Sequence, residues 1–435
     1  MAEDFSLSIK SLTKRGWGAS DDYEVFGALP GEQIIAQKIK RGKARLLSIE
    51  TKSPDRVDAR CSHAGSCGGC AFQTLDYSAQ LLLKQNRIQS LFTHPVNPII
   101  PCDEPFQMRN KMEFSFSQDK AGNKFLGLHM PAAKGRVIDI EHCHLVAPWF
   151  SDALQAVRTW WSSNNLNAFH PHRQTGALRT LTMREGKRTG SRMVILTVDG
   201  AAREELTQNH LSAFKALFDQ DTSLFLHIHQ AIAGKPTELF EMHLQGPDHL
   251  SEELHLEDRI LKFSISPAAF FQPNTYQAEK LYTAALKLCL PLHGSVYDLY
   301  AGVASLGILF APYASDVTSV EINPYSICDA ETNIELNGIT NLKLIRSDVA
   351  LALADLPKKP ALALIDPPRA GLGPKAIAHL KELNPDQILY ISCNPNTQAQ
   401  DIEQLSAYEI KTLQPVDQFP HTPHLENIAL LVKKL

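Results

Sequence analysis

The sequence predicts a multidomain protein with a small N-terminal β-barrel, an α+β middle domain and a C-terminal doubly wound α/β domain. The chain has 435 residues, enough for two or three domains of about 150 residues each. Residues 5–50 alternate apolar and polar positions between Gly-containing turns, whereas from about residue 290 short apolar strands alternate with helical stretches. We therefore expect domains at 1–55, 56–262 and 263–435.

Composition excludes several classes of protein. With 44% hydrophobic and 21% charged residues, the chain is neither fibrous nor disordered. The first ten residues carry acids where a signal peptide needs basic residues, and no apolar run reaches the roughly 18 residues of a membrane span. Eight cysteines in so long a chain do not form a disulfide framework. We expect a cytoplasmic protein that does not enter a membrane.

Charge is distributed unevenly along the chain. Residues 291–435 hold 10 Lys and Arg against 16 Asp and Glu, so the first 290 residues hold the remaining 33 against 31. Residues 38–60 alone contain eight basic residues and three acids. This segment is either a surface for nucleic-acid phosphates or the solvated edge of a strand.

The barrel is followed by a cysteine-bearing loop at 61–70 and then by a helical pattern at 73–92. Strand patterns joined by Gly-containing turns predict hairpins in the middle domain, at 109–118, 125–130, 136–140, 177–184 and 192–199. Short apolar runs predict the parallel strands of the last domain, at 296–300, 317–321, 342–346, 361–366, 388–393 and 428–432.

A nucleotide site is indicated where the first strand of the last domain ends. Gly302 and Gly307 flank a turn into a helix, and Glu321 ends the next strand, where a carboxylate can accept hydrogen bonds from a ribose. Ala304 takes the middle position of the glycine pattern. Because Asp348 and Asp366 end two further strands, the pattern favours S-adenosylmethionine over a dinucleotide. The alternative is that these acids only cap turns and helices.

Cys393 follows an apolar strand, at the rim where open α/β sheets bind ligands, and a thiolate there is an effective nucleophile. Glu426 comes just before the last strand and could face the same rim as a general base. The alternative for a lone cysteine is a small buried apolar residue.

These residues carry a resemblance that spans nearly the whole chain. The sequence resembles the uracil-C5 RNA methyltransferases that use S-adenosylmethionine, specifically the iron-sulfur-containing 23S rRNA type with an N-terminal TRAM domain. The most specific motifs are Cys61-x5-Cys67-Gly68-Gly69-Cys70, Phe270-Phe271-Gln272-Pro273-Asn274, Asp298-Leu299-Tyr300, Asp366-Pro367-Pro368-Arg369, Ser392-Cys393-Asn394-Pro395 and His421-Thr422-Pro423-His424-Leu425-Glu426.

The resemblance implies a Rossmann-like methyltransferase domain and roles for its residues. Cys393 would attack C6 of a flipped-out uracil, and Glu426 would remove the C5 proton after methyl transfer. The family positions around the cofactor and the target base fall on Gln272, Tyr300, Ser305, Glu321, Asp348 and Asp366. The sequence departs from the family at Ala304, usually Gly, and at Ala301, usually Cys.

Cys61, Cys67 and Cys70 are spaced as metal ligands, and spacing leaves zinc and an iron-sulfur cluster equally open, with His63, His142 and His144 as further donors. The resemblance implies that Cys143 is the fourth ligand of a [4Fe-4S] cluster with a structural or RNA-positioning role.

The function that we expect is transfer of a methyl group to C5 of a uridine in RNA, rRNA rather than tRNA, by a monomeric protein. Two alternatives remain. Asp366-Pro367-Pro368 also fits methylation of an exocyclic amine, although Cys393 and Glu426 would then have no purpose. A non-catalytic RNA-binding iron-sulfur protein is favoured only by Ala304.

Overall fold

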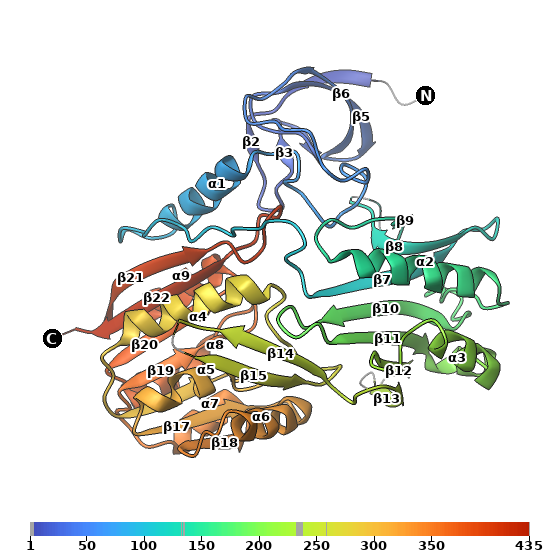
Figure 1. The fold of residues 1–435 in the computed structure, drawn as a ribbon. Coiled ribbons are helices and arrows are strands. Elements are labelled where there is room, and N and C mark those ends of the chain that lie inside the picture. Colours follow the sequence, from blue (N-terminus) through green and yellow to red (C-terminus); the bar gives the residue numbers. More distant parts are fainter. Residues whose placement is uncertain (1–3, 132, 134, 232–237, 258, 435) are drawn as a thin grey trace.

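The computed structural model describes residues 4–131, 133, 135–231, 238–257 and 259–434. The N-terminal part is β-rich, as the sequence predicts. Figure 1 shows that its six-stranded sheet is strongly curled. The strands are β1 (Asp4–Ser8), β2 (Ser11–Leu12), β3 (Gly18–Ala19), β4 (Glu24–Val25), β5 (Gln33–Lys40) and β6 (Lys43–Thr51). Ile9, Val25 and Ile34 are buried at its centre.

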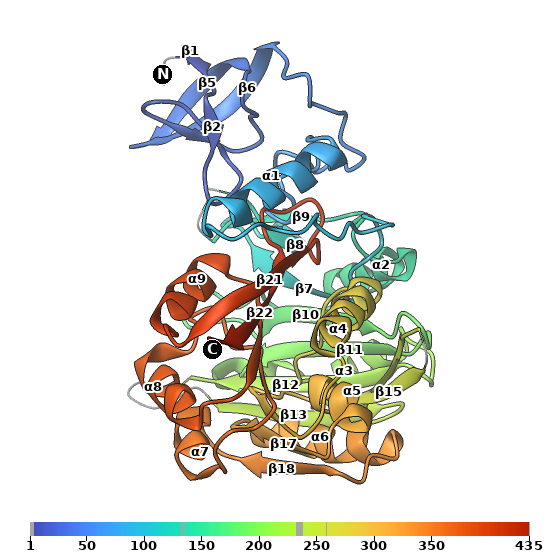
Figure 2. The same cartoon turned by 90° about the vertical axis from the view of Figure 1, so that its left-hand side faces the viewer.

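Helix α1 (Tyr77–Gln89) follows the cysteine-bearing loop. It begins later than the predicted 73–92 because the Asp76 side chain caps it, accepting from the backbone nitrogens of Ser78 and Ala79. It also ends earlier, at Gln89. Figures 1 and 2 both place α1 between the curled sheet and the C-terminal sheet.

The middle of the chain forms a seven-stranded sheet in the order β13-β12-β11-β10-β7-β8-β9. Trp161 and Phe150 of α2 and Phe214 of α3 are buried in one core with Phe114 of the sheet. The strands are β7 (Lys111–Gln118), β8 (Lys124–His129), β9 (Val137–Asp139), β10 (Leu178–Glu185), β11 (Arg192–Asp199), β12 (Ser223–Gln230) and β13 (Glu238–Gln245). The helices are α2 (Pro148–Ser162), η1 (Gly200–Glu205) and α3 (Gln208–Lys215). The five predicted strands correspond to β7–β11.

A two-stranded sheet, β14 (Leu250–His255) with β15 (Ile260–Ile265), and helix α4 (Thr275–Cys289) lead into the last sheet. That sheet has the order β18-β17-β16-β19-β20-β22-β21, and β22 runs antiparallel to both of its neighbours, β20 and β21. Its strands are β16 (Ser295–Leu299), β17 (Asp316–Glu321), β18 (Leu342–Arg346), β19 (Leu362–Ile365), β20 (Gln387–Ser392), β21 (Tyr408–Val416) and β22 (Glu426–Lys433).

Helices cover this last sheet, so the predicted doubly wound α/β domain is confirmed (Figure 2). They are α5 (Ser305–Phe310), η2 (Ala311–Tyr313), α6 (Pro324–Leu336), α7 (Val349–Asp355), α8 (Gly373–Leu383) and α9 (Pro395–Gln404). The order of the strands reverses between β16 and β19, and such a switch point is where open α/β sheets bind ligands, at the carboxyl ends of the strands. No helix within the described ranges combines the length and apolar content that a membrane crossing requires.

Candidate active site

Four predicted site residues follow or end parallel strands at one edge of the C-terminal sheet. Tyr300 follows β16, Glu321 ends β17, Asp366 follows β19 and Cys393 follows β20. The strands pair in parallel as neighbours, so their carboxyl ends meet. The buried apolar residues of β19 and β20 fix this register.

The turn after β16 is tight, and Glu321 shapes it. The Glu321 carboxylate accepts hydrogen bonds from the backbone nitrogen of Gly302 at 2.9 Å and from that of Asn323 at 2.7 Å. Tyr300 and Ala304 both have positive φ angles, 65° and 62°. Ala304 therefore adopts the left-handed conformation that glycine takes easily, and the turn forms despite this departure from the family pattern.

Ser305 begins α5, and its hydroxyl lies 3.0 Å from that of Tyr282 on α4. Burial raises the pKa of Tyr282, and the charges of Asp366, Asp298 and Glu426 contribute. Ser305 is thus close to the carboxylates of the site. Asp348 caps α7 by accepting from Ala350 and Leu351, as the alternative interpretation of the strand-end acids predicts. It also lies near Tyr300, whose pKa rises to about 12 through burial and the charge of Asp348.

Asp298, in β16, lies next to this turn. Its side chain is 1% exposed and accepts from Gly307 N and Ser319 Oγ, both at 3.0 Å. Burial raises the pKa of Asp298 to about 7. Asp298 therefore holds the first turn of α5 against the sheet through Gly307.

Cys393 and Glu426 come together because β20 and β22 are antiparallel neighbours, with Ser392 opposite Asn427. Burial raises the pKa of Cys393, and the charge of Glu426 raises it further. Burial also raises the pKa of Glu426 well above its usual value, and the neighbouring Asp366 adds to this rise. Glu426 is 4% exposed, and its Oε2 has no hydrogen-bond partner within the described part of the chain.

Asp366 and Arg369 complete this group. Burial raises the pKa of Asp366 to about 7, helped by the charge of Asp298. Arg369 is exposed, and its guanidinium lowers the pKa of both Cys393 and Glu426. The sequence motif contains Arg369, but we predicted no role for it. Its position three residues after Asp366 could have indicated that it lies at the site.

Gln272 precedes α4 and is 5% exposed. Its Oε1 accepts from Gln418 Nε2 at 3.4 Å, and its backbone oxygen accepts from Asn110 Nδ2 at 2.8 Å. Gln418 lies in the loop between β21 and β22. Gln272 is therefore connected to the segment that leads to Glu426.

The four cysteines singled out in the sequence line one cavity of about 230 Å³, together with His63, His142 and His144. Burial raises the pKa of Cys143 to about 11, and nearby Cys67 and Cys61 add to the rise. Burial and the other three cysteines likewise raise the pKa of Cys70. Among the described residues, no group of three or more His, Cys, Asp or Glu side chains has an arrangement that would hold a metal ion.

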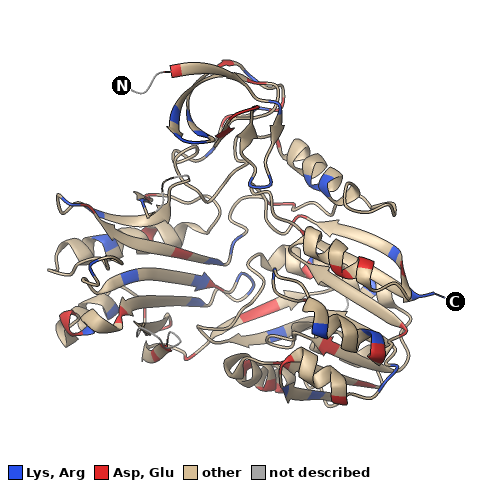
Figure 3. Ribbon diagram, turned by 180° about the vertical axis from the view of Figure 1, so that it is seen from behind, with Lys and Arg blue, Asp and Glu red and all other residues tan. Residues whose placement is uncertain are grey.

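The basic segment 38–60 divides into two sets. Arg56 is a structural residue, because it bonds to the buried carboxylate of Glu32 and to Gly27 O. Lys43 lies over the Trp17 ring, 4.3 Å from its centroid. The other basic side chains are exposed, namely Lys38, Lys40, Arg41, Arg45, Lys52 and Arg60. Figure 3 shows Lys and Arg on the curled N-terminal sheet.

Residues 202–434 match the model of a protein family described as tRNA (Uracil-5-)-methyltransferase. The chain is 44% identical to an uncharacterized RNA methyltransferase of Protochlamydia amoebophila, over 94% of this chain and 99% of that one. It is 30% identical to an uncharacterized RNA methyltransferase of Caldanaerobacter subterraneus, over 99% of both chains.

Among solved structures, the chain is similar to the tRNA (uracil-54, C5)-methyltransferase of Pyrococcus abyssi in complex with S-adenosyl-L-homocysteine. The TM-score is 0.77 with 26% sequence identity, and the match covers 98% of this chain and 100% of the other. The likeness therefore extends over the whole arrangement of sheets.

Proposed function

The chain belongs to the family of S-adenosylmethionine-dependent RNA uracil-C5 methyltransferases, and we propose that Cys393 is its nucleophile and Glu426 its base. The observation that carries this proposal is the pairing of β20 with β22, which brings the two side chains together. Burial raises the pKa of both groups, and Arg369 lowers it. The same grouping disfavours methylation of an exocyclic amine, which needs no thiol.

Uracil C5 is a weak nucleophile, and addition of a thiolate at C6 activates it. The Cys393 sulfur forms a bond to C6, and the electron pair of the C5–C6 double bond moves toward O4 as an enolate. C5 then takes the methyl group of S-adenosylmethionine, whose S–CH3 bond would break so that S-adenosylhomocysteine leaves as a neutral thioether. Glu426 removes the C5 proton, the C5–C6 double bond re-forms, and the C6–S bond breaks to release Cys393.

The cofactor is proposed to lie at the switch point of the sheet. The residues that we assign to it or to the target base are Gln272, Tyr300, Ser305, Glu321, Asp348 and Asp366. Support comes from the hydrogen bond of Gly302 to Glu321 and from the charge of Asp348, which raises the pKa of Tyr300. The exposed Ile322, directly after Glu321, offers an apolar contact for an adenine.

Cys61, Cys67, Cys70 and Cys143 are proposed to hold a [4Fe-4S] cluster. A single zinc needs all its sulfurs about 2.3 Å from one point, whereas a four-iron cluster takes each thiolate on a different iron and so suits donors spread around a cavity. The four cysteines that line one cavity of about 230 Å³ match the four thiolate ligands of such a cluster. It would tie Cys143, which lies between β9 and α2, to the loop before α1.

The RNA is proposed to be 23S rRNA, as the sequence resemblance implies, bound in part by the exposed basic side chains of β5 and β6. Methylation of purified 23S rRNA and of bulk tRNA, followed by mass spectrometry of nuclease fragments, tests this. Methyl transfer to tRNA alone would contradict the rRNA assignment and leave the reaction intact.

The reaction is tested with the holoenzyme. In Cys393→Ala we expect methyl transfer to be lost while S-adenosylhomocysteine still binds, because the thiol acts on the base. RNA containing 5-fluorouridine should trap a covalent complex with the native protein, since fluorine cannot leave as a proton. Substantial turnover by Cys393→Ala would contradict the nucleophile.

Glu426→Gln separates the two halves of the reaction. The thiol adduct should form and be methylated, but without a base at C5 it should not break down. We expect a methylated protein–RNA complex that survives denaturing gel electrophoresis. Normal turnover by this variant would move the base elsewhere, to Asp366 in the first place.

A further inference from the structure

The position of Glu426 depends on the loop 417–425. Val416 at the end of β21 pairs with Glu426 at the start of β22, so this loop closes the hairpin at the proposed base. No described residue bonds to Oε2 of Glu426. No side chain among the described residues holds this oxygen, so the carboxylate depends on the backbone at residue 426, to which the loop leads.

Helix α1 holds this loop through an ion pair removed from water. Lys84 donates to Asp417 across 2.5 Å, and the two side chains are 2% and 0% exposed. Lys84 also donates to Phe419 O at 3.0 Å, and Tyr77 OH donates to the other oxygen of Asp417 at 2.8 Å. The first residue of the loop is thus fixed from two positions of α1.

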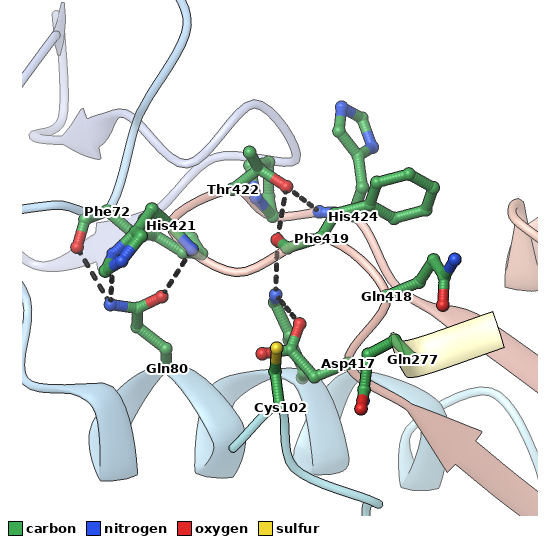
Figure 4. A network of polar contacts seen from close by, with 12 residues as sticks. Phe72, Gln80, Cys102, Gln277, Asp417, Gln418, Phe419, His421, Thr422 and His424 are labelled. Carbon is green, nitrogen blue, oxygen red and sulfur yellow. Dashed lines mark hydrogen bonds and ion pairs between the residues drawn. The ribbon is translucent and has the colours of Figure 1, made fainter. Parts of the chain in front are cut away.

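Gln80 lies one turn before Lys84 and fixes the middle of the loop. Its Oε1 accepts from His421 N at 2.9 Å, and its Nε2 donates to Phe72 O at 3.0 Å (Figure 4). Phe72 N in turn donates to His421 O at 3.0 Å. His421 has a positive φ of 63°, a conformation that needs support from its surroundings.

The other side of the loop faces the substrate-binding residues. Gln418 Nε2 donates to Gln272 Oε1 and, at 3.1 Å, to Asn274 O. A buried Lys–Asp pair rarely stabilises more than an apolar pair of the same size, so stability alone does not account for it. The Lys84–Asp417 pair instead restricts the loop to a single conformation between α1 and Gln272.

We propose that Lys84 and Gln80 are positioning residues for the catalytic base, holding the loop 417–425 so that Glu426 meets the C5 proton. This inference rests on the proposed function. It assigns α1 to one step, proton removal and release of Cys393, and leaves thiol addition and methyl transfer to other groups.

The test compares steps in the full-length holoenzyme. For Lys84→Met we expect adduct formation with 5-fluorouridine RNA to keep its wild-type rate. Release of methylated natural RNA should slow by about 100-fold, the effect of misplacing a catalytic group by about 1 Å. The methylated covalent complex should accumulate, as in Glu426→Gln.

Two controls separate positioning from loss of stability. Arg179→Met breaks another part-buried pair, Arg179–Asp199 at 2.6 Å between β10 and β11, and should lower stability without changing the ratio of release to addition. The double variant Lys84→Met/Asp417→Asn removes the unpaired buried charge but keeps an acceptor for Tyr77. It should regain thermal stability while release stays slow.

The rates of release and addition in these variants decide whether α1 positions the base. Equal ratios of release to addition in Lys84→Met and Arg179→Met would overturn the inference, as would recovery of release in the double variant. If Lys84→Met does not fold, Gln80→Leu keeps the ion pair and must show the same slow release. Absence of any adduct with the native protein would instead defeat the proposed function.

Discussion

Arg369 controls the ionisation of both proposed catalytic groups. Its guanidinium lowers the pKa of Cys393 and of Glu426, against the burial that raises them. Both groups act in their ionised forms, as thiolate and as carboxylate. An exposed cation thus favours the ionised form of two buried acids.

We predict that Arg369→Ala shifts the acid side of the pH–rate profile to higher pH. Without the guanidinium both pKa values rise, so at a given pH a larger fraction of each group is protonated and inactive. Single-turnover methyl transfer measured from pH 6 to pH 9 checks this. Arg369→Lys keeps the charge and should shift the profile less, whereas identical profiles for the native protein and Arg369→Ala would contradict the assignment.

The sequence predicted where site residues lie in the fold better than it predicted the hydrogen bonds between side chains. Strand ends located Glu321, Asp366 and Cys393, because parallel strands deliver their ends to one edge. The bonds of Glu321 to Gly302, and of Arg56 to Glu32, could not be foreseen. Such bonds join residues that no local periodicity connects, since only folding brings them together.

At the element scale, α5 sits close to the sheet because residue 307 is glycine. A Cβ at Gly307 would lie 2.5 Å from Ser319 Oγ and 2.9 Å from Asp298 Oδ2. The helix could therefore approach β16 and β17 less closely with any other residue. The glycine identified in the sequence as part of a nucleotide turn also sets this packing distance.

We predict that Gly307→Ala lowers the free energy of unfolding by about 1 to 3 kcal/mol, the usual cost of overpacking. It should also weaken S-adenosylhomocysteine binding, because α5 carries Ser305. Urea unfolding and calorimetric titration check the two effects. Gly302→Ala is the matched control: nothing lies within 4 Å of its Cβ, so it should cost only the left-handed backbone, about 1 kcal/mol. A stable, tightly binding Gly307→Ala would contradict this packing.

The six strands predicted in the last domain agree with the observed ones to within two residues at each end. Continuous buried apolar runs account for this in β19 and β20. The exposed strand β13 and the partly exposed β21 have no such signal. Helices α2 and α4 were also not predicted, and the buried stripe of α1 contains Gln80 and Lys84, which an apolar pattern cannot reveal.

At the scale of the whole molecule, the exposed cations of the N-terminal sheet are separate from the catalytic edge. Removing two of them, in Lys38→Gln/Arg45→Gln, should weaken RNA binding and reduce the slope of log K against log salt by about 1.4 to 1.8. S-adenosylhomocysteine affinity should not change. The control pair Lys120→Gln/Lys375→Gln, exposed on other domains, should leave the slope near its native value. Filter binding at several salt concentrations checks this, and equal slopes for the two double variants would contradict an RNA surface on this sheet.

The cysteine cavity lies between the loop before α1 and the middle sheet. A cluster bound there should therefore stabilise the contact between these two parts. Anaerobically purified protein should contain about four irons. In Cys143→Ser iron should be lost, the melting temperature should fall and RNA binding should weaken more than cofactor binding. Metal analysis, calorimetry and binding assays check these effects. Stoichiometric zinc without iron or sulfide would contradict the cluster, and Cys102→Ser, at a thiol outside the cavity, is the control.

The Lys84–Asp417 pair also has a consequence for the order in which the protein is made. Its partners are 333 residues apart, so a ribosome completes α1 long before it supplies the loop. Until then Lys84 must stay in water, because an unpaired ammonium cannot be buried cheaply. The nascent chain can thus expose its basic N-terminal sheet to RNA before Glu426, the proposed catalytic base, has reached its position. Methylation competence is therefore expected to arise last, when the final hairpin docks on a helix formed early in synthesis.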